Sequence, residues 1–169
     1  VSTATGDVVL LHDTDYSGAA TASISSGITS TYGEYIFKFY NMNPDTDSVY
    51  FGFQVNATDD PGGGYDTSLI TSTHFTTEHE EDDNPAAFLE YWLGLAQSAN
   101  DQRLTDTLGN GADESCAGEL HLFNPASTTY VKHFYAMVQH YHSADRQKCS
   151  YAAGYINDTT AIDDIQFKM

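Results

Sequence analysis

The chain has 169 residues, of which 40% are hydrophobic and 13% aromatic, enough to build the core of one domain. It carries 24 Asp and Glu against 6 Lys and Arg, a formal net charge of −18. This balance excludes a basic surface for nucleic acid and argues against docking on anionic membranes. The sequence also lacks the run of about 18 apolar residues that a transmembrane helix needs.

Most of the chain alternates apolar and polar side chains with a period of two, which is typical of β-strands. The pattern predicts strands at residues 7–12, 19–24, 34–42, 48–57, 68–77, 118–124, 129–142, 150–156 and 162–169. In the longest of them, Phe134, Ala136 and Val138 share one face. Short strands with one apolar and one polar face favour an all-β fold, an antiparallel jelly-roll-like sandwich that spans residues 1–169 as a single domain.

One segment has helical rather than strand spacing. Asn84 and Pro85 match an N-cap and a first helical residue. An amphipathic stripe follows at Phe88, Leu89, Trp92, Leu93 and Ala96. The stripe predicts one short helix over residues 85–97 that covers an open edge or end of the sheets. Trp92 is then expected to have a core or covering role, and the alternative is a place in a ligand platform.

Two segments, residues 39–47 and 120–128, share an order of strand, Asn-Pro, polar turn and aromatic strand. The Asn side chain can hydrogen-bond to the backbone of the turn, and Pro fixes the φ angle of the first central residue of the turn. Both segments therefore predict hairpins. The two hairpins would be the two halves of a jelly roll, and chance resemblance is the alternative.

The only cysteines are Cys116 and Cys149. They are expected to be reduced, half-buried thiols, with a single disulfide as the alternative. Their spacing fits neither a zinc knuckle nor a redox pair.

Candidate catalytic groups are weak. The acidic run from Glu78 to Asp83 is expected to be a solvated loop rather than the desolvated carboxylate pair that glycoside cleavage requires. His74 and His79 lack the spacing of a metalloprotease pair. His140 and His142 point the same way along one strand, so they either chelate a metal with a third ligand or, as we expect, lie on the wet face.

Calcium is the better metal candidate, because hard oxygen ligands in loops suit it. The candidate carboxylates are Asp13, Asp15, Asp45, Asp47, Asp59, Asp60 and Asp66. They do not match the helix-loop-helix calcium pattern, and no site is assigned to them. There is also no nucleophile elbow. The sequence therefore predicts no catalytic, cofactor-binding or metal-ligating residue, with bound calcium left open.

Several stretches resemble structural proteins of marine tailed bacteriophages. They read SGITSTYGEYIFKF (26–39), GELHLFNP (118–125), YVKHF (130–134), AGYIN (153–157) and TAIDDIQFKM (160–169). In that group the chain continues with a Gly-rich turn and one more strand, so we expect this sequence to be a fragment of a slightly longer chain. The resemblance implies a location at the virion surface, as a capsid decoration or a tail-fibre attachment module, and no enzymatic residues.

The expected function is therefore that of a non-enzymatic virion surface protein that binds copies of itself or other virion proteins. Aromatic residues on the second faces of the strands would suit such an interface. They are Tyr40, Tyr50, Tyr135 and Tyr141. The first alternative is a calcium-braced carbohydrate-binding module that recognises a host surface glycan, and the second is a glycan-degrading enzyme. All three can share one fold.

Overall fold

The computed structural model describes residues 8–59, 64–65, 68–82 and 87–169. Within these residues the chain is all β and has no helix. The described residues therefore contain no helix that is long and apolar enough to cross a membrane. The strands are β1 (Thr21–Ile24), β2 (Glu34–Met42), β3 (Gly52–Ala57), β4 (Ile70–Glu80), β5 (Phe88–Tyr91), β6 (Gln102–Arg103), β7 (Cys116–Phe123), β8 (Lys132–His142), β9 (Arg146–Ile156) and β10 (Ile162–Lys168).

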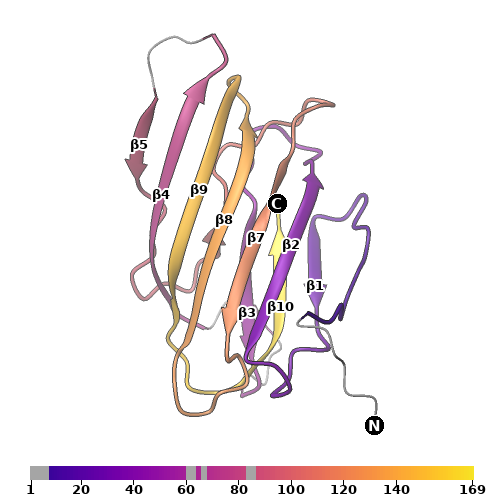
Figure 1. Cartoon of the computed structure of the whole chain (residues 1–169), viewed down its shortest axis with the longest axis vertical. Coiled ribbons are helices and arrows are strands. Elements are labelled where there is room, and N and C mark those ends of the chain that lie inside the picture. The colour runs from indigo at the N-terminus through magenta and orange to yellow at the C-terminus, as the bar shows by residue number, and fades with distance from the viewer. Residues whose placement is uncertain (1–7, 60–63, 66–67, 83–86) are drawn as a thin grey trace.

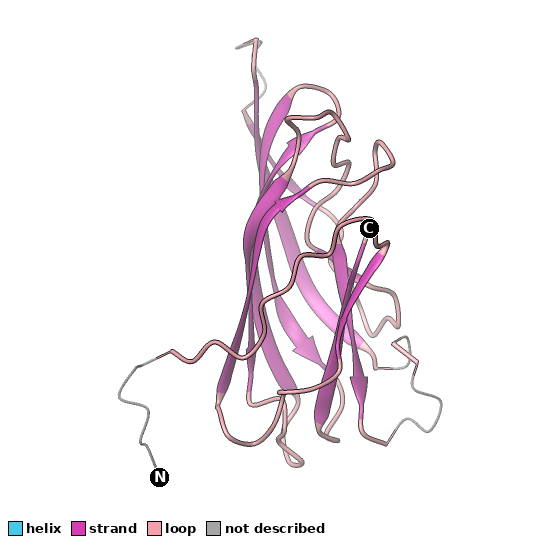
Figure 2. Ribbon diagram, turned by 90° about the vertical axis from the view of Figure 1, so that its right-hand side faces the viewer, coloured by secondary structure: helices cyan, strands magenta, loops and turns pink. Residues whose placement is uncertain are grey.

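The strands form two antiparallel sheets that pack face to face as a sandwich (Figures 1 and 2). One sheet has four strands in the order β1-β10-β3-β6, and the other has six in the order β2-β7-β8-β9-β4-β5. Every pair of neighbouring strands is antiparallel. The predicted all-β antiparallel sandwich is confirmed.

Aromatic side chains from both sheets fill the space between the layers. Phe39 and Phe53 are buried, and each meets a neighbouring ring edge-on, Phe39 on Phe51 and Phe53 on Phe134. Phe167 from β10 contacts several of these rings and joins the layers. Burying each such side chain stabilises the fold by about 1.5–3 kcal/mol.

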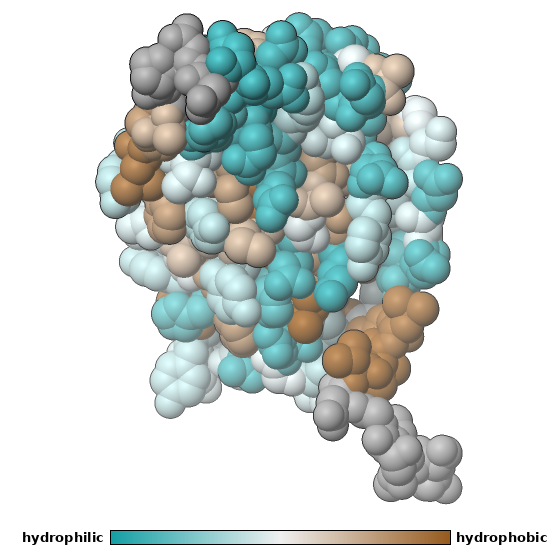
Figure 3. Space-filling view, turned by 45° about the horizontal axis from the view of Figure 1, so that its top comes forward, coloured by the Kyte–Doolittle hydropathy of each residue, from teal (hydrophilic) through white to brown (hydrophobic). Residues whose placement is uncertain are grey.

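The strand predictions are confirmed in most places, and β2 has the predicted bounds. β3 begins at Gly52, later than expected: Ser48 adopts a φ of 61°, and Val49 forms only an isolated bridge with Leu108. β6 is a two-residue strand that the sequence pattern did not indicate. The first predicted strand is not formed at residues 8–12, where Val8, Val9, Leu10 and Leu11 are exposed. Figure 3 shows a hydrophobic patch, in brown, at the lower right of this view.

The predicted helix over residues 85–97 is wrong within the described residues 87–97. Residues 88–91 form the edge strand β5, which pairs with β4 from Phe75 to Glu78. Leu93 and Gln97 adopt positive φ values of 62° and 48°, which a right-handed helix does not allow. The free edge of β4 offers backbone hydrogen bonds to this segment. These hydrogen bonds favour a strand more than the spacing of the apolar residues favours a helix.

The two Asn-Pro segments behave differently. Asn124 and Pro125 lie in the turn between the paired strands β7 and β8, as predicted for a hairpin. Asn43 and Pro44 instead connect β2 in one sheet to β3 in the other, so the predicted hairpin there is wrong. The Asn43 amide donates to the carbonyl of Gly111 and holds the crossing against the segment before β7.

Both cysteines are free and buried, so the expected thiols are confirmed and the disulfide alternative is not. They are buried more fully than the half-buried state expected. Cys116 lies in the core, where burial raises the pKa of its thiol to about 12. Cys149 faces away from the core between Thr77 and Gln139.

Candidate functional site

The side chains of β4, β8 and β9 are sorted by charge between the two faces of the six-stranded sheet. The inward positions of these strands carry Glu78, Glu80, Lys132, Arg146 and Lys148, together with histidines such as His140 and with apolar and small polar residues. None of the outward positions of the same three strands is Asp, Glu, Lys or Arg. The charged groups of these strands therefore point between the sheets, which reverses the usual arrangement.

The inward groups form a cluster that we call the inner ionic cluster: Glu78, Asp106, His140, Arg146 and Lys148. Asp106 comes from the segment that follows β6, and the other four come from β4, β8 and β9. The side chains of Glu78, Asp106, His140 and Lys148 are 2%, 3%, 0% and 4% exposed. Arg146 lies nearer the solvent at 32%.

Lys148 is the centre of this cluster. Its Nζ lies 2.7 Å from Oδ2 of Asp106 and 2.8 Å from Oε2 of Glu78. Oδ1 of Asp106 lies 2.6 Å from Nε2 of His140, which must be the donor because a carboxylate oxygen only accepts. Nη1 of Arg146 lies 3.2 Å from Oε1 of Glu78. Each buried carboxylate is thus matched by a cation, as burial of charge requires.

The contacts stabilise the charged forms of the buried pair. Burial alone would raise the pKa of Asp106, but the hydrogen bonds from His140 and Lys148 outweigh it and hold that pKa well below its ordinary value. Burial likewise would lower the pKa of Lys148, and the contacts with Asp106 and Glu78 raise it instead. At neutral pH the resting pair is therefore ionised.

His74 lies next to this cluster without joining it. The residue is 3% exposed, and neither ring nitrogen has a hydrogen-bond partner of good geometry. Burial lowers the pKa of His74 to about 4, which the nearby Asp106 carboxylate offsets only in part. The imidazole is therefore neutral at pH 7.

The outward positions of β4, β8 and β9 form a surface that we call the uncharged face. Its members are Thr71, Thr73, Phe75, Thr77, His79, His133, Tyr135, Met137, Gln139, Tyr141, Gln147, Cys149, Tyr151, Ala153 and Tyr155. This is the face of the six-stranded sheet turned toward the viewer in Figure 1.

Aromatic residues line up across the uncharged face. The register places Phe75 opposite Tyr151, and Tyr151 opposite Met137. The rings of Phe75 and Tyr151 stack at 4.8 Å with an angle of 15° between their planes. Tyr91 of β5 continues the row at the sheet edge, 6.1 Å from Phe75. The row presents flat apolar surface without a charge.

The predicted row of tyrosines is only partly formed. Tyr40, Tyr135 and Tyr141 belong to the six-stranded sheet. Tyr50 does not join them, because its hydroxyl donates to Asp101 and its ring lies 4.3 Å from the Arg103 guanidinium. The expected covering role of Trp92 is also wrong, since this side chain is 45% exposed at the edge next to β5.

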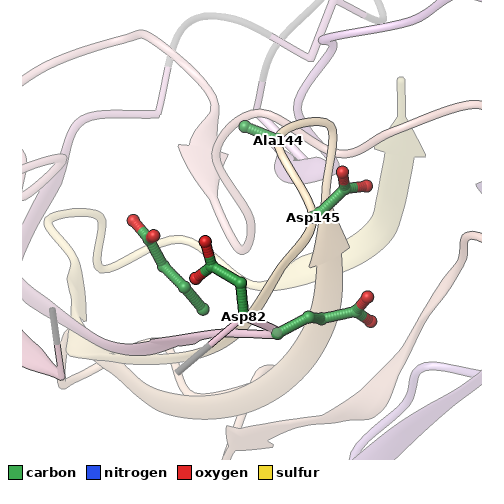
Figure 4. A pocket seen from close by; sticks show the side chains of 5 residues that line it. Asp82, Ala144 and Asp145 are labelled. Atoms are coloured by element: carbon green, nitrogen blue, oxygen red, sulfur yellow. The ribbon is translucent and has the colours of Figure 1, made fainter. Parts of the chain in front are cut away.

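A hollow between two turns is lined mainly by acidic residues. Its lining residues are Glu80, Glu81, Asp82, Ala144 and Asp145. Figure 4 shows Asp82 from the turn after β4 near Ala144 and Asp145 from the turn between β8 and β9. The teal residues at the top of Figure 3 show the same hydrophilic end of the molecule. Four of the five lining residues are acidic and none of them is basic, so the hollow is negatively charged.

The predictions for individual residues are corrected at two points. Glu78 is a buried strand residue, so the expected solvated loop is wrong there, and Asp83 lies outside the described residues. His140 is buried on the inward face, so the expected wet-face position is wrong for it. His74 and His79 lie on opposite faces of β4 and cannot bind one ion together.

No group of three or more His, Cys, Asp or Glu side chains that could hold a metal ion occurs among the described residues. Asp60 and Asp66 lie outside those residues. The Asp59 carboxylate accepts a hydrogen bond from the Thr160 hydroxyl at 2.9 Å.

Comparisons with known proteins give no match: no family model fits the chain, and no curated protein or solved structure is significantly similar to it.

Proposed function

We propose that this chain is a non-enzymatic structural subunit of a virion surface, which binds a second copy of itself through the uncharged face. The observation that carries the proposal is the absence of Asp, Glu, Lys and Arg from the outward positions of β4, β8 and β9. Two copies of a chain with a net charge of −18 repel each other, so they can associate only where charge is scarce.

The chemistry of that face supports an interface between proteins. Tyrosine and methionine are enriched in protein interfaces, while Lys, Glu and Asp are depleted. Tyr135, Met137 and Tyr151 lie on adjacent strands and fit this composition. The flat sheet also suits a self-complementary contact about a two-fold axis.

The strand order supports a jelly roll with one inserted hairpin. When β8 and β9 are set aside, the remaining strands follow the orders 1-10-3-6 and 2-7-4-5. Two interlocked Greek keys produce this order, and jelly rolls of this kind build viral capsid and lectin domains. The extra pair, β8 and β9, carries two of the three strands of the uncharged face.

The experiment is the mass of the protein in solution, measured by light scattering over a range of concentrations. The wild type is expected to form an oligomer with a contact above roughly 1,000 Å². Met137→Glu places a charge on the uncharged face, beside Tyr151 and opposite Glu119 of β7, and should shift the mass to that of a monomer. Thr159→Glu, in an exposed loop, is the matched control and should leave the oligomer intact. A wild type that stays monomeric at high concentration would contradict the proposal.

The second candidate is a carbohydrate-binding module, and the edge of the six-stranded sheet favours it. Tyr91 is 76% exposed, and the neighbouring Trp92 adds a second exposed ring. Such rings stack on sugars, and calcium could brace the loops of this sandwich. Binding on a glycan array that Trp92→Ala or Tyr141→Ala abolishes would favour this candidate, whereas turnover of a host polysaccharide would establish the enzyme alternative.

A further inference from the structure

The inner ionic cluster places an amine against a carboxyl group where both side chains are almost fully buried, with the more exposed Arg146 and Glu90 on the solvent side. Lys148 Nζ lies 2.7 Å from Oδ2 of Asp106, and both side chains are at least nine-tenths buried. A second carboxylate, that of Glu78, lies 2.8 Å from the same nitrogen. Two groups held at contact distance react as if at a very high effective concentration.

We propose that Lys148 and Asp106 form a covalent amide bond, an intramolecular isopeptide cross-link, with the loss of one water molecule. Lys148 supplies the nucleophile and Asp106 supplies the carboxyl carbon. The chain needs no cofactor, oxidant or second protein for this step.

The surrounding groups provide the proton transfers that the bond requires. Lys148 passes one proton to Oδ2 of Asp106, and the resulting free amine attacks Cγ of Asp106. The attacking nitrogen then gives a second proton to the Glu78 carboxylate. The Nζ–Cγ bond forms, and negative charge develops on Oδ1. The Cγ–Oδ2 bond then breaks, and Oδ2 takes the proton back from Glu78 and leaves as water. The three protons of the ammonium group end as one amide hydrogen and two water hydrogens, and Glu78 returns to its starting form.

His140 is placed to stabilise the intermediate. Its Nε2–H points at Oδ1 of Asp106 from 2.6 Å, which is the oxygen that becomes negative during the attack. A donor fixed in that position before the reaction lowers the barrier, as in an oxyanion hole. His140 is fully buried and so cannot be replaced there by solvent.

The product is favoured because it removes two buried charges. An ionised Lys and Asp lose their hydration on burial, a cost that their mutual attraction offsets only in part. A neutral amide has a far smaller cost. Glu78 keeps its second partner, Arg146, after the reaction, so no carboxylate is left unpaired. The ionised resting pair makes the step slow, but the dry site protects the product from hydrolysis and lets it accumulate.

The bond would join the two layers of the sandwich. Lys148 belongs to β9 in the six-stranded sheet. Asp106 follows β6 in the four-stranded sheet, where the amide of Leu104 donates to the carbonyl of Phe51 at 2.8 Å. The cross-link would therefore resist separation of the sheets.

The test is the intact mass of the purified wild-type protein under denaturing conditions, after prolonged incubation in the folded state. We expect a mass lower than that of the sequence by one water molecule. A tryptic digest should then contain residues 104–132 joined to residues 147–168, uncleaved after Lys148. The unmodified mass would overturn the proposal, and so would a loss of water without the joined peptides.

Three variants separate the roles of the residues. Lys148→Arg keeps the cation but cannot form the amide, so it should show its unmodified mass. Glu78→Gln should form the bond at least about 100-fold more slowly, the usual effect of removing a general base. Formation at the wild-type rate would overturn the role given to Glu78. Lys168→Met is the matched control, because Lys168 also contacts an Asp, Asp101, at 2.6 Å, but this pair is open to solvent. This variant should keep the loss of water.

Discussion

Replacing His74 by leucine should make the protein markedly less sensitive to acid. His74 is buried and neutral, and neither of its ring nitrogens has a hydrogen-bond partner of good geometry. Burial lowers the pKa of His74 from 6.5 to about 4 in the folded protein. Leucine has a similar volume and cannot be protonated, so His74→Leu removes the titration and leaves the core filled.

The size of the effect follows from this pKa. As the pH falls below 6.5, the unfolded chain binds a proton at His74, while the folded protein does not accept one until about pH 4. The unfolded state therefore binds more protons across this window, and stability falls with the pH. One pKa unit corresponds to about 1.4 kcal/mol, so the wild type should lose about 3 kcal/mol through His74 by pH 4. That is a large part of the 5–15 kcal/mol typical of a domain.

The assay is urea unfolding of wild type and His74→Leu at a series of pH values from 7 to 4. The difference between their free energies of unfolding should change by about 3 kcal/mol across the series. The lowered pKa of His142, which burial also causes, acts in the same direction but is common to both proteins. His133→Gln, on the exposed face, should follow the wild type. Identical pH dependence in wild type and His74→Leu would refute the reasoning.

Further predictions concern the core, the strand packing and the buried thiol. Phe53→Ala should lower the free energy of unfolding by about 3–5 kcal/mol in urea titrations, because the ring is fully buried against Phe134. A loss below 1 kcal/mol would mean that the core relaxes around the cavity. Gly154→Ala should cost about 1–3 kcal/mol, since a Cβ there would lie 2.3 Å from the Thr71 carbonyl oxygen. Ala153→Ser, on the exposed side of the same strand, should change the melting temperature little. Cys116, whose pKa burial raises to about 12, should react with a thiol reagent only after unfolding. Rapid labelling of the native protein at Cys116 would contradict its placement in the core.

The alternation of side chains predicted the sheets well where both faces of a strand differ in polarity. Residues 34–39 alternate between the two faces, and β2 has the predicted bounds, Glu34–Met42. The same rule fails over residues 88–97, because the spacing of the apolar residues fits a helix better than a strand. The deciding feature there is the free edge of β4, a contact between distant residues that no local pattern contains.

The inner ionic cluster was missed for two reasons. The signal for His140 was present, since it continues the buried series Phe134, Ala136 and Val138 by one step of two residues. The signal for Glu78 was hidden, because it begins an acidic run that looks like a loop, although β4 extends to Glu80. Asp106 comes from a loop, and only the three-dimensional packing brings it to Lys148.

The position of β10 has a consequence for how the protein folds during synthesis. This strand follows the other described strands in the sequence, yet it lies between β1 and β3 in the four-stranded sheet. β1 and β3 leave the ribosome early, but until β10 has been made β1 has no neighbour in its sheet and β3 has only the two-residue β6. The edge of β3 that pairs with β10 therefore stays unpaired until then, and an unpaired strand edge exposes the nascent chain to aggregation.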